Sequence, residues 1–302
     1  SMITVAVPVP AATPNLTCTD ASTIKTYNCR VDAASDADVV LATDFPVTGR
    51  NEGGFTDLTP SLGLDCALWQ TVAPARVPGP GIDQDGYLAP WLAEVAASGR
   101  TVRAVLGYCA GSVFAGALAE RIAARQPTAP QVVVFDPELV DVPTVHLQFG
   151  RVIGNMTAVL TSAEVDELAG AAERLAARPG ITPAEFAAEL YAIFEPIGSA
   201  ALRRAGLDEG YAGELVALVG SFMTYLGVAA GLDPRPGWSR ATVITSASPA
   251  SGLNRMRATP GLAPIGVADE VRFDVEHRDL LRTPEVATTV AGLLGAGSQA
   301  RR

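Results

Sequence analysis

One segment constrains the fold of this chain more than any other: an apolar strand that leads directly into a glycine-flanked cysteine and then into a helix. The strand pattern VRAVL ends at Leu106, and Gly107-Tyr108-Cys109-Ala110-Gly111 follows it. The helical pattern GSVFAGALAERIAAR then covers residues 111–125. A nucleophile between two glycines in this context is typical of a nucleophile elbow, a tight turn that raises one side chain above the edge of a sheet. Cys109 is therefore a candidate nucleophile, although a buried structural cysteine in a chance five-residue pattern explains the same letters.

The strand before Cys109 belongs to an alternation of strands and helices. Short apolar runs bounded by turn residues predict buried strands, and a helical pattern lies between the second and the third of them. The strands are expected at 38–45, 67–72, 102–106 and 131–135, and the helix at 84–98. This alternation indicates a parallel sheet with right-handed crossovers. We expect an α/β domain over residues 38–302, preceded by an extended N-terminal lead-in over 1–37.

A block of helices interrupts the alternation. Helical periodicity covers 161–177 and 182–204, and each stretch opens with a Thr-x-x-Glu capping box. An uncharged stretch at 215–232 follows them. The pattern then returns to two strands and a last helix, expected at 240–246, 271–275 and 284–294. This layout predicts an α/β core with an inserted helical lid at about 144–236.

The uncharged stretch 215–232 reaches the lower length limit of a membrane-spanning helix. It contains glycines and polar residues, and no second stretch accompanies it, which favours a buried helix or the wall of an apolar ligand channel. The N-terminal sequence lacks a basic region before an apolar run and is broken by prolines, so no signal peptide is expected. We therefore expect a cytoplasmic protein without a membrane partner.

Composition excludes two other classes of function. The chain has 32 acidic and 22 basic residues, a formal net charge of −10, and no basic run interleaved with aromatic residues, which argues against nucleic-acid binding. The four cysteines form no CxxC pair and show no Cys/His spacing of a zinc site. They are Cys18, Cys29, Cys66 and Cys109. We expect neither a metal ion nor a cofactor held by this chain.

Two further residues occupy positions where an acid and a base would complete a site around Cys109. Asp136 follows the strand QVVVF, at the edge of the sheet where ligand sites of such folds form, although a turn cap is the alternative. His277 lies between the last expected strand and the last helix. The only other histidine, His146, falls near the start of the helical block and is interpreted as structural.

Nucleophile, acid and histidine in this chain order are typical of α/β-hydrolases. GYCAGS, the aspartate at a strand end, the helical insertion and H-x-x-L-L-x-x-P-x-V resemble, over about residues 38–295, the type I thioesterase domains of nonribosomal peptide and polyketide synthases. The resemblance implies an α/β-hydrolase fold, with a mostly parallel central sheet, flanking helices and an inserted helical lid. It also implies that Cys109 is the acylated nucleophile, His277 the base and Asp136 its orienting partner.

Three positions depart from the family pattern. Cysteine replaces the usual serine, Ser112 replaces a common second glycine, and DFPVTGRNEGG replaces the usual glycine-rich loop after the first strand. Some members of the family carry a natural cysteine, and we interpret Cys109 as natural rather than introduced. For the oxyanion hole we expect the backbone N–H of Ala110 and a donor from the loop near Pro46 and Val47.

The resemblance implies a thioesterase that releases an acyl, peptidyl or polyketide chain from the phosphopantetheine of a carrier protein. Release would occur by cyclisation, by transfer to an amine or hydroxyl acceptor, or by hydrolysis. The side chains expected along the substrate channel are Tyr108, Phe222, Tyr225 and Leu226. Two alternatives remain: a cysteine hydrolase similar to dienelactone hydrolases, which resemble a bare core without a helical insertion, and an inactive α/β-hydrolase-like module that binds an acyl group or a carrier.

Overall fold

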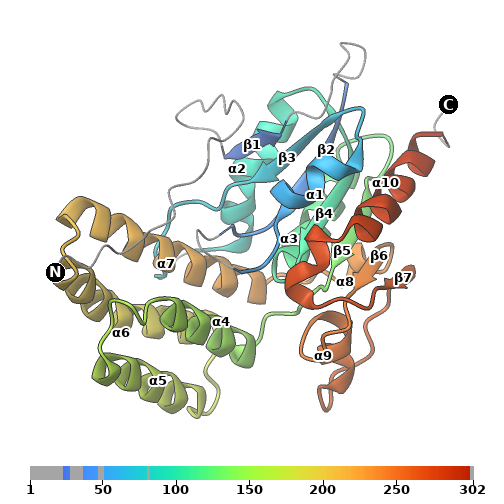
Figure 1. Cartoon of the computed structure of the whole chain (residues 1–302). Coiled ribbons are helices and arrows are strands. Elements are labelled where there is room, and N and C mark those ends of the chain that lie inside the picture. Colours follow the sequence, from blue (N-terminus) through green and yellow to red (C-terminus); the bar gives the residue numbers. More distant parts are fainter. Residues whose placement is uncertain (1–22, 28–36, 47–50, 80–81, 300–302) are drawn as a thin grey trace.

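The computed structural model describes residues 23–27, 37–46, 51–79 and 82–299, which build a central sheet with helices on both faces (Figure 1). The sheet has seven strands in the order β1-β3-β2-β4-β5-β6-β7. The strands are β1 Ile24–Tyr27, β2 Asp38–Thr43, β3 Ala67–Thr71, β4 Thr101–Tyr108, β5 Gln131–Phe135, β6 Thr242–Thr245 and β7 Asp269–Arg272. Strand β1 is antiparallel to β3, and all other neighbouring pairs are parallel.

The register of the central strands positions the candidate site. In the parallel pairs, Gly107 of β4 lies opposite Thr43 of β2, and Tyr108 lies opposite Phe135 of β5. The carboxyl ends of these three strands are therefore level with one another. Because Cys109 directly follows β4 and Asp136 directly follows β5, both residues emerge at the same edge of the sheet, where parallel α/β sheets bind their ligands.

Alternate residues of β2 pack into two separate hydrophobic clusters, one on each face of the sheet. Val39 and Leu41 join helices α2 and α3, whereas Val40 and Ala42 join α1, η1 and α10. The helices of the core are α1 Phe55–Leu62, α2 Gln84–Ala97, α3 Gly111–Ala123, α8 Arg235–Trp238, α9 Gly252–Ala258, the 3₁₀ helix η1 His277–Arg282 and α10 Pro284–Gln299. Cover on both faces explains why the central strands are apolar on both sides.

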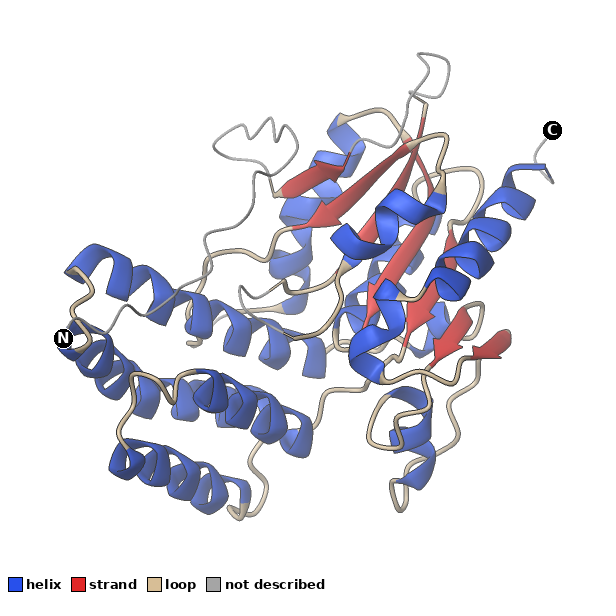
Figure 2. Ribbon diagram, in the orientation of Figure 1, coloured by secondary structure: helices blue, strands red, loops and turns tan. Residues whose placement is uncertain are grey.

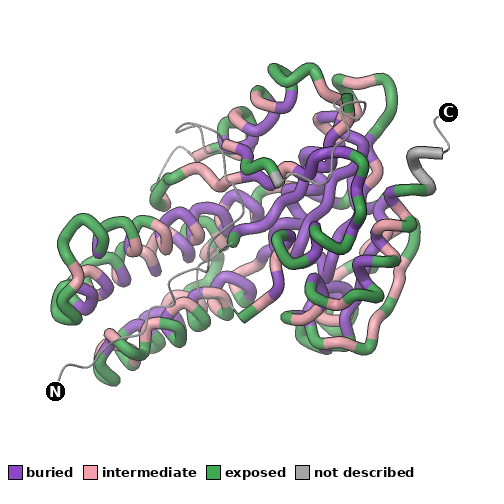
Figure 3. The backbone as a smooth tube through the Cα atoms, turned by 45° about the horizontal axis from the view of Figure 1, so that its top comes forward, coloured by how far each residue is buried: buried purple, intermediate pink, exposed green. Residues whose placement is uncertain are grey.

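Four helices are inserted between β5 and β6 and lie together beside the sheet (Figure 2). They are α4 Val142–Asn155, α5 Ser162–Ala176, α6 Pro183–Arg204 and α7 Glu209–Ala230. Their facing sides are buried and their outer sides are exposed (Figure 3). Helix α7 connects the insertion to the core, because the ring of Tyr225 lies 4.3 Å from that of Phe114 on α3 and 5.2 Å from that of Phe45 after β2.

Within the described ranges, α7 is the one helix that is long and apolar enough to cross a membrane. Of its most apolar window, 61% is buried inside the protein. Met223 and Leu226, for example, are completely inaccessible to solvent. This burial agrees with the preference for a buried helix over a membrane span, since a core helix of this length needs no lipid to cover it.

The structure also contains elements that the sequence analysis does not predict. Strand β1 lies within the expected lead-in, so that expectation is wrong for Ile24–Tyr27; residues 1–22 and 28–36 lie outside the described part. A short edge strand with exposed Lys25 and Thr26 carries no apolar run. Helices α1 and α4 are also additional, and Pro60 inside α1 obscures its helical pattern. Strand β7 begins two residues before the expected position.

Both predicted capping boxes are formed, and one of them provides a test of local stability. The Thr182 hydroxyl accepts from the Glu185 N–H at 3.2 Å, and the Glu185 carboxylate accepts from the Thr182 N–H at 2.9 Å. Thr182→Ala should lower the free energy of unfolding by about 1 kcal/mol, because the Glu185 N–H at the start of α6 loses its acceptor, the Thr182 hydroxyl. Urea denaturation measures this. Thr288→Ala, at an exposed position inside α10, is the control and should change stability by less than about 0.5 kcal/mol. Equal losses in the two variants would contradict the capping role.

Candidate active site

The turn between β4 and α3 holds Cys109 in a strained conformation. Its φ angle is 52°, in the left-handed region that non-glycine residues rarely adopt. Both flanking glycines are required by close packing. A Cβ at Gly107 would lie 2.6 Å from the Cα of Ser112, and a Cβ at Gly111 would collide with the backbone carbonyl of Thr43. The glycine–cysteine–glycine spacing therefore forms the elbow that it predicts, with the thiol raised at the edge of the sheet.

Asp136 and His277 form a buried hydrogen bond next to this turn. The carboxylate Oδ2 of Asp136 lies 2.7 Å from Nδ1 of His277, and its Oδ1 accepts from the N–H of Ser246 at 2.9 Å. Asp136 is completely buried and His277 is 6% exposed. Asp136 also has a positive φ, 40°, which turns its side chain toward the start of η1. A carboxylate at Nδ1 keeps the proton there and leaves Nε2 as the acceptor, the tautomer that a general base needs.

Three further contacts hold His277 in place. Its backbone N–H donates to the hydroxyl of Ser248 at 2.8 Å, and its carbonyl accepts from the hydroxyl of Tyr108 at 3.0 Å. The ring of Tyr108 stacks on the imidazole at a centroid distance of 4.8 Å and an angle of 14°. Tyr108 was expected to line a substrate channel. It does line the cavity, and its ring and hydroxyl also contact His277.

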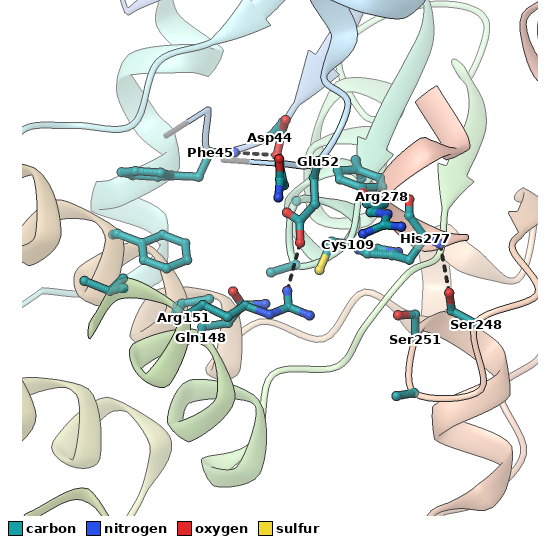
Figure 4. Close-up of a pocket in the computed structure, with 18 of the residues that line it drawn as sticks. Asp44, Phe45, Glu52, Cys109, Gln148, Arg151, Ser248, Ser251, His277 and Arg278 are labelled. Carbon is teal, nitrogen blue, oxygen red and sulfur yellow. Dashed lines mark hydrogen bonds and ion pairs between the residues drawn. The ribbon is translucent and has the colours of Figure 1, made fainter. Parts of the chain in front are cut away.

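The thiol of Cys109 lies beside the imidazole of His277 in the cavity (Figure 4). Within the described part of the chain, no hydrogen bond joins the sulfur to a ring nitrogen of His277. The nucleophile and the base are thus neighbours that are not hydrogen-bonded to each other. Such contacts are often long in the absence of substrate and tighten when it binds.

The surroundings of Cys109 favour the neutral thiol. Burial raises the pKa of this thiol well above its ordinary value, and the negative charges of Glu138 and Glu52 raise it further. A hydrogen bond from the backbone N–H of Ala110 and the positive charge of Arg151 act in the opposite direction but are weaker. At neutral pH the sulfur therefore carries its proton, and any attack by it requires a base to remove that proton.

Glu138 is a member of the site that the sequence analysis missed. It is 4% exposed, its backbone N–H donates to the Cys109 carbonyl at 3.4 Å, and its carboxylate accepts from the Gly252 N–H at 3.4 Å. Burial raises the pKa of this carboxyl, and the nearby His277 and Arg255 act in the opposite direction. Nothing in the letters Asp-Pro-Glu marks the glutamate as buried, and only its place two residues after Asp136 could have suggested it.

Of the groups expected to form an oxyanion hole, one N–H lies next to Cys109. The N–H of Ala110 points at the sulfur, at the first turn of α3, where backbone N–H groups lack partners within the helix. The prediction of Pro46 is wrong, because proline has no N–H and this residue is exposed outside the cavity lining. Val47 lies outside the described residues. The N–H of Phe45 donates to its neighbour Asp44 at 2.8 Å, so it is already engaged.

Cys109 and His277 open into a cavity of about 590 Å³ between the core and the insertion (Figure 4). All four expected channel residues line it: Tyr108, Phe222, Tyr225 and Leu226. Phe222 and Tyr225 pack against Phe45, with ring centroids 5.0 and 5.2 Å apart, and the lining also includes polar and charged residues. His146 is not part of this lining and instead packs edge-on against Phe186, as expected of a structural histidine.

The described residues were also compared with the ligand sets of metal centres. Among those residues, no group of three or more His, Cys, Asp or Glu side chains is placed to hold a metal ion. Cys66 is buried, and Cys18 and Cys29 lie outside the described residues.

No protein-family model and no curated protein sequence matches this chain. Among solved structures, a carboxylesterase from the thaumarchaeon Nitrososphaera gargenis is similar, with a TM-score of 0.51 over 95% of this chain and 100% of the other, at 10% identity. The NocB thioesterase domain from the nocardicin cluster aligns at a TM-score of 0.49 and 16% identity, over 90% and 99% of the two chains. The RedJ thioesterase of prodiginine biosynthesis in Streptomyces coelicolor aligns at 0.45 and 15%, over 96% and 91%.

The chain has the α/β-hydrolase fold. The parallel strand order, the elbow after β4 and the acid after β5 are its defining features, and the similarity to the carboxylesterase extends over nearly the whole chain. At 10% identity this similarity concerns the fold alone. Function therefore rests on the geometry of the site, because unrelated reactions share this fold.

The position of Glu138 predicts a change in thiol reactivity. Glu138→Gln removes a negative charge that raises the pKa of Cys109, so the thiolate fraction at pH 8 should increase. Alkylation of Cys109 by iodoacetamide, followed on the Cys109 peptide by mass spectrometry, should become about threefold to tenfold faster. Glu164→Gln, on the exposed side of the insertion, is the matched control and should leave the rate unchanged. An unchanged rate in correctly folded Glu138→Gln would exclude this electrostatic effect.

Proposed function

We propose that this protein is a thioesterase that uses Cys109 to accept an acyl chain from the phosphopantetheine arm of an acyl or peptidyl carrier protein. The observation that carries the proposal is the buried Asp136–His277 hydrogen bond of 2.7 Å beside the Cys109 thiol, at the wall of a cavity of about 590 Å³. A carboxylate–imidazole pair next to a nucleophile on an elbow is the arrangement that acyl transfer requires. The carrier supplies the pantetheine, so the chain needs no cofactor of its own.

In the first step, Nε2 of His277 removes the Cys109 proton while the sulfur bonds to the thioester carbonyl carbon. The carbonyl electron pair moves onto oxygen, where the N–H of Ala110 stabilises the negative charge. The bond to the pantetheine sulfur then breaks, and His277 returns its proton to the departing thiolate. Asp136 accepts the Nδ1–H hydrogen bond throughout and stabilises the imidazolium. The raised pKa of the Cys109 thiol fits this order of steps, because a neutral thiol becomes nucleophilic only when the base removes its proton.

A cysteine nucleophile changes what the second step can use. The acyl-enzyme is itself a thioester, so the first step exchanges one thioester for another and keeps the acyl group activated. An amine, or a hydroxyl that closes a ring, then attacks the carbonyl carbon while His277 takes its proton. As the carbonyl re-forms, the bond from that carbon to the Cys109 sulfur breaks, and His277 gives the proton to the departing thiolate. Water in the same role yields the free acid.

The insertion acts as a lid in this proposal. Phe222, Tyr225 and Leu226 of α7 form an apolar wall together with Phe45, and an acyl chain lying along it would displace water from the acyl-enzyme. A dienelactone-hydrolase-like reaction has no specific observation in its favour, and the four inserted helices argue against the bare core expected for it. A binding-only module would not need the Asp136–His277 pair, whose burial is costly.

Intact-protein mass spectrometry after mixing with a panel of acyl-pantetheine thioesters tests the acyl-enzyme. The wild type should gain the mass of the acyl group and release the pantetheine thiol. Cys109→Ala should gain none, and His277→Ala should acylate about a hundredfold to ten-thousandfold more slowly, because the base is lost.

The matched control for this experiment is His146→Ala, which removes the other histidine and should acylate like the wild type. An adduct that persists in Cys109→Ala would contradict the assignment of the nucleophile. The absence of both adduct and turnover across the panel would contradict the enzymatic proposal.

Cys109→Ser tests the role of the thioester intermediate. The serine variant forms a less activated oxoester, so we expect a larger share of free acid relative to cyclised or transferred product. The partition is measured by liquid chromatography and mass spectrometry of the products from one acyl thioester offered with an amine acceptor. An unchanged partition would show that cysteine confers no preference between acceptors.

A further inference from the structure

The charged side chains that line the cavity differ in how many hydrogen-bond partners they have within the protein. They are Asp44, Glu52, Arg151, Glu276 and Arg278. Asp44 accepts from the N–H of Phe45, and Glu276 accepts from the hydroxyl of Ser248, so neither carboxylate is free for a ligand without losing a partner. The remaining three charges are Glu52 and the two arginines.

Glu52 and Arg151 form an ion pair across the cavity beside Cys109 (Figure 4). Arg151 comes from α4 of the insertion and Glu52 from the segment between β2 and α1, and Nη1 lies 2.9 Å from Oε1. Both charges act on the reacting sulfur: Glu52 raises the pKa of Cys109 and Arg151 lowers it. Both side chains line the cavity together with Cys109, so the pair is close to the position that a reacting carbonyl would occupy (Figure 4).

The pair uses only part of the hydrogen-bonding capacity of the arginine. On the outer surface, Arg178 donates through both Nη1 and Nη2 to the two oxygens of Glu189, and Arg204 does the same with Glu164. Arg151 donates to Glu52 through Nη1 alone, and no described residue occupies its Nε or Nη2. A planar guanidinium with open N–H groups in a cavity matches the two oxygens of a carboxylate or phosphate.

Arg278 is less suited than Arg151 to bind a carboxylate or phosphate in the cavity. Its side chain is 62% exposed and its Nε lies 3.6 Å from Asp279, so it lies in a solvated position at the outer part of the lining. Arg151 is 43% exposed and is held over the cavity by Glu52. A half-exposed ion pair with one hydrogen bond contributes little stability, because solvent screens its charges. A second anion that bonds to the remaining N–H groups of Arg151 would add to the interaction.

We infer that Arg151 binds an oxyanion group of the substrate, a carboxylate or a phosphate, with Glu52 as the internal anion that the substrate displaces or shares. The inference rests on the proposed function and narrows its substrate class. The thioester substrate carries a negative charge on one side of the scissile carbonyl and an apolar portion, which the wall of Phe222 and Leu226 receives. Two sources supply the same chemistry: a carboxylate on the acyl chain or the phosphate of the pantetheine arm.

Binding of four amide analogues, in which NH replaces the thioester sulfur, tests the inference without turnover. The acyl chain ends in a carboxylate or in a carboxamide, and each form is made on pantetheine and on 4′-phosphopantetheine. Isothermal titration with the wild-type protein should show roughly tenfold to hundredfold tighter binding when the recognised group is charged. The position of the effective charge, on the acyl chain or on the arm, identifies its source.

Variants of the ion pair should act in opposite directions. Arg151→Gln should reduce the charge preference to less than about threefold, whereas Glu52→Gln should strengthen binding of the charged analogue about threefold to tenfold, because the internal competitor is removed. Neither variant should change the affinity for the neutral analogue. Arg178→Gln, which breaks an ion pair on the outer surface, is the matched control and should leave all four affinities unchanged.

Three results would overturn the inference. Equal affinities for charged and neutral analogues would do so, as would loss of the preference in Arg278→Gln but not in Arg151→Gln, or weaker binding in Glu52→Gln. If the analogues bind without charge preference while Cys109 is acylated, this inference is wrong and the proposed function stands. If the charge preference is found without any acylation, the oxyanion site stands and the enzymatic proposal fails. If none of the four analogues binds and no acylation occurs, both are wrong.

Discussion

The buried hydrogen bond between Asp136 and His277 is the interaction on which the rest of the site depends. It joins two residues 141 positions apart in sequence, and it forms only because β5 and the segment after β7 end at the same edge of the sheet. The parallel register provides this alignment, and the positive φ angles of Asp136 and Cys109 direct both side chains toward one point. Strain at these two residues is offset by the close packing of the glycines around them.

The electrostatics of the site support this geometry. Burial and two carboxylates keep the proton on the Cys109 thiol, and the proposed thioesterase therefore works through a base rather than through a preformed thiolate. Glu138 contributes to this state from the turn after β5, and Glu52 contributes from the segment after β2. The insertion adds the opposing charge of Arg151, so the core supplies the reacting groups while the insertion supplies part of their environment.

Cys109, Asp136 and His277 are recognisable in sequence because each directly follows a strand pattern, and parallel strands bring such positions together. Glu138, Glu52 and Arg151 are not recognisable, because their letters also suit ordinary surface residues and their placement near the thiol depends on neighbours distant in sequence. Loop position alone points to Pro46, and its lack of an N–H excludes it as a donor. Strand β1 was missed because an edge strand needs little apolar character.

The sequence by itself determined the parallel α/β architecture, the elbow at Cys109, the capped helices α5 and α6, and the three residues of the candidate triad. These are local patterns of periodicity and turn chemistry, and they depend on neighbours within a few residues along the chain. Only the tertiary structure decided that Tyr108 stacks on His277, that Glu138 is buried beside the thiol, and that Glu52 meets Arg151 across the cavity. Those contacts join segments from 29 to 169 residues apart, and their geometry follows from strand register and helix packing, which no local pattern encodes.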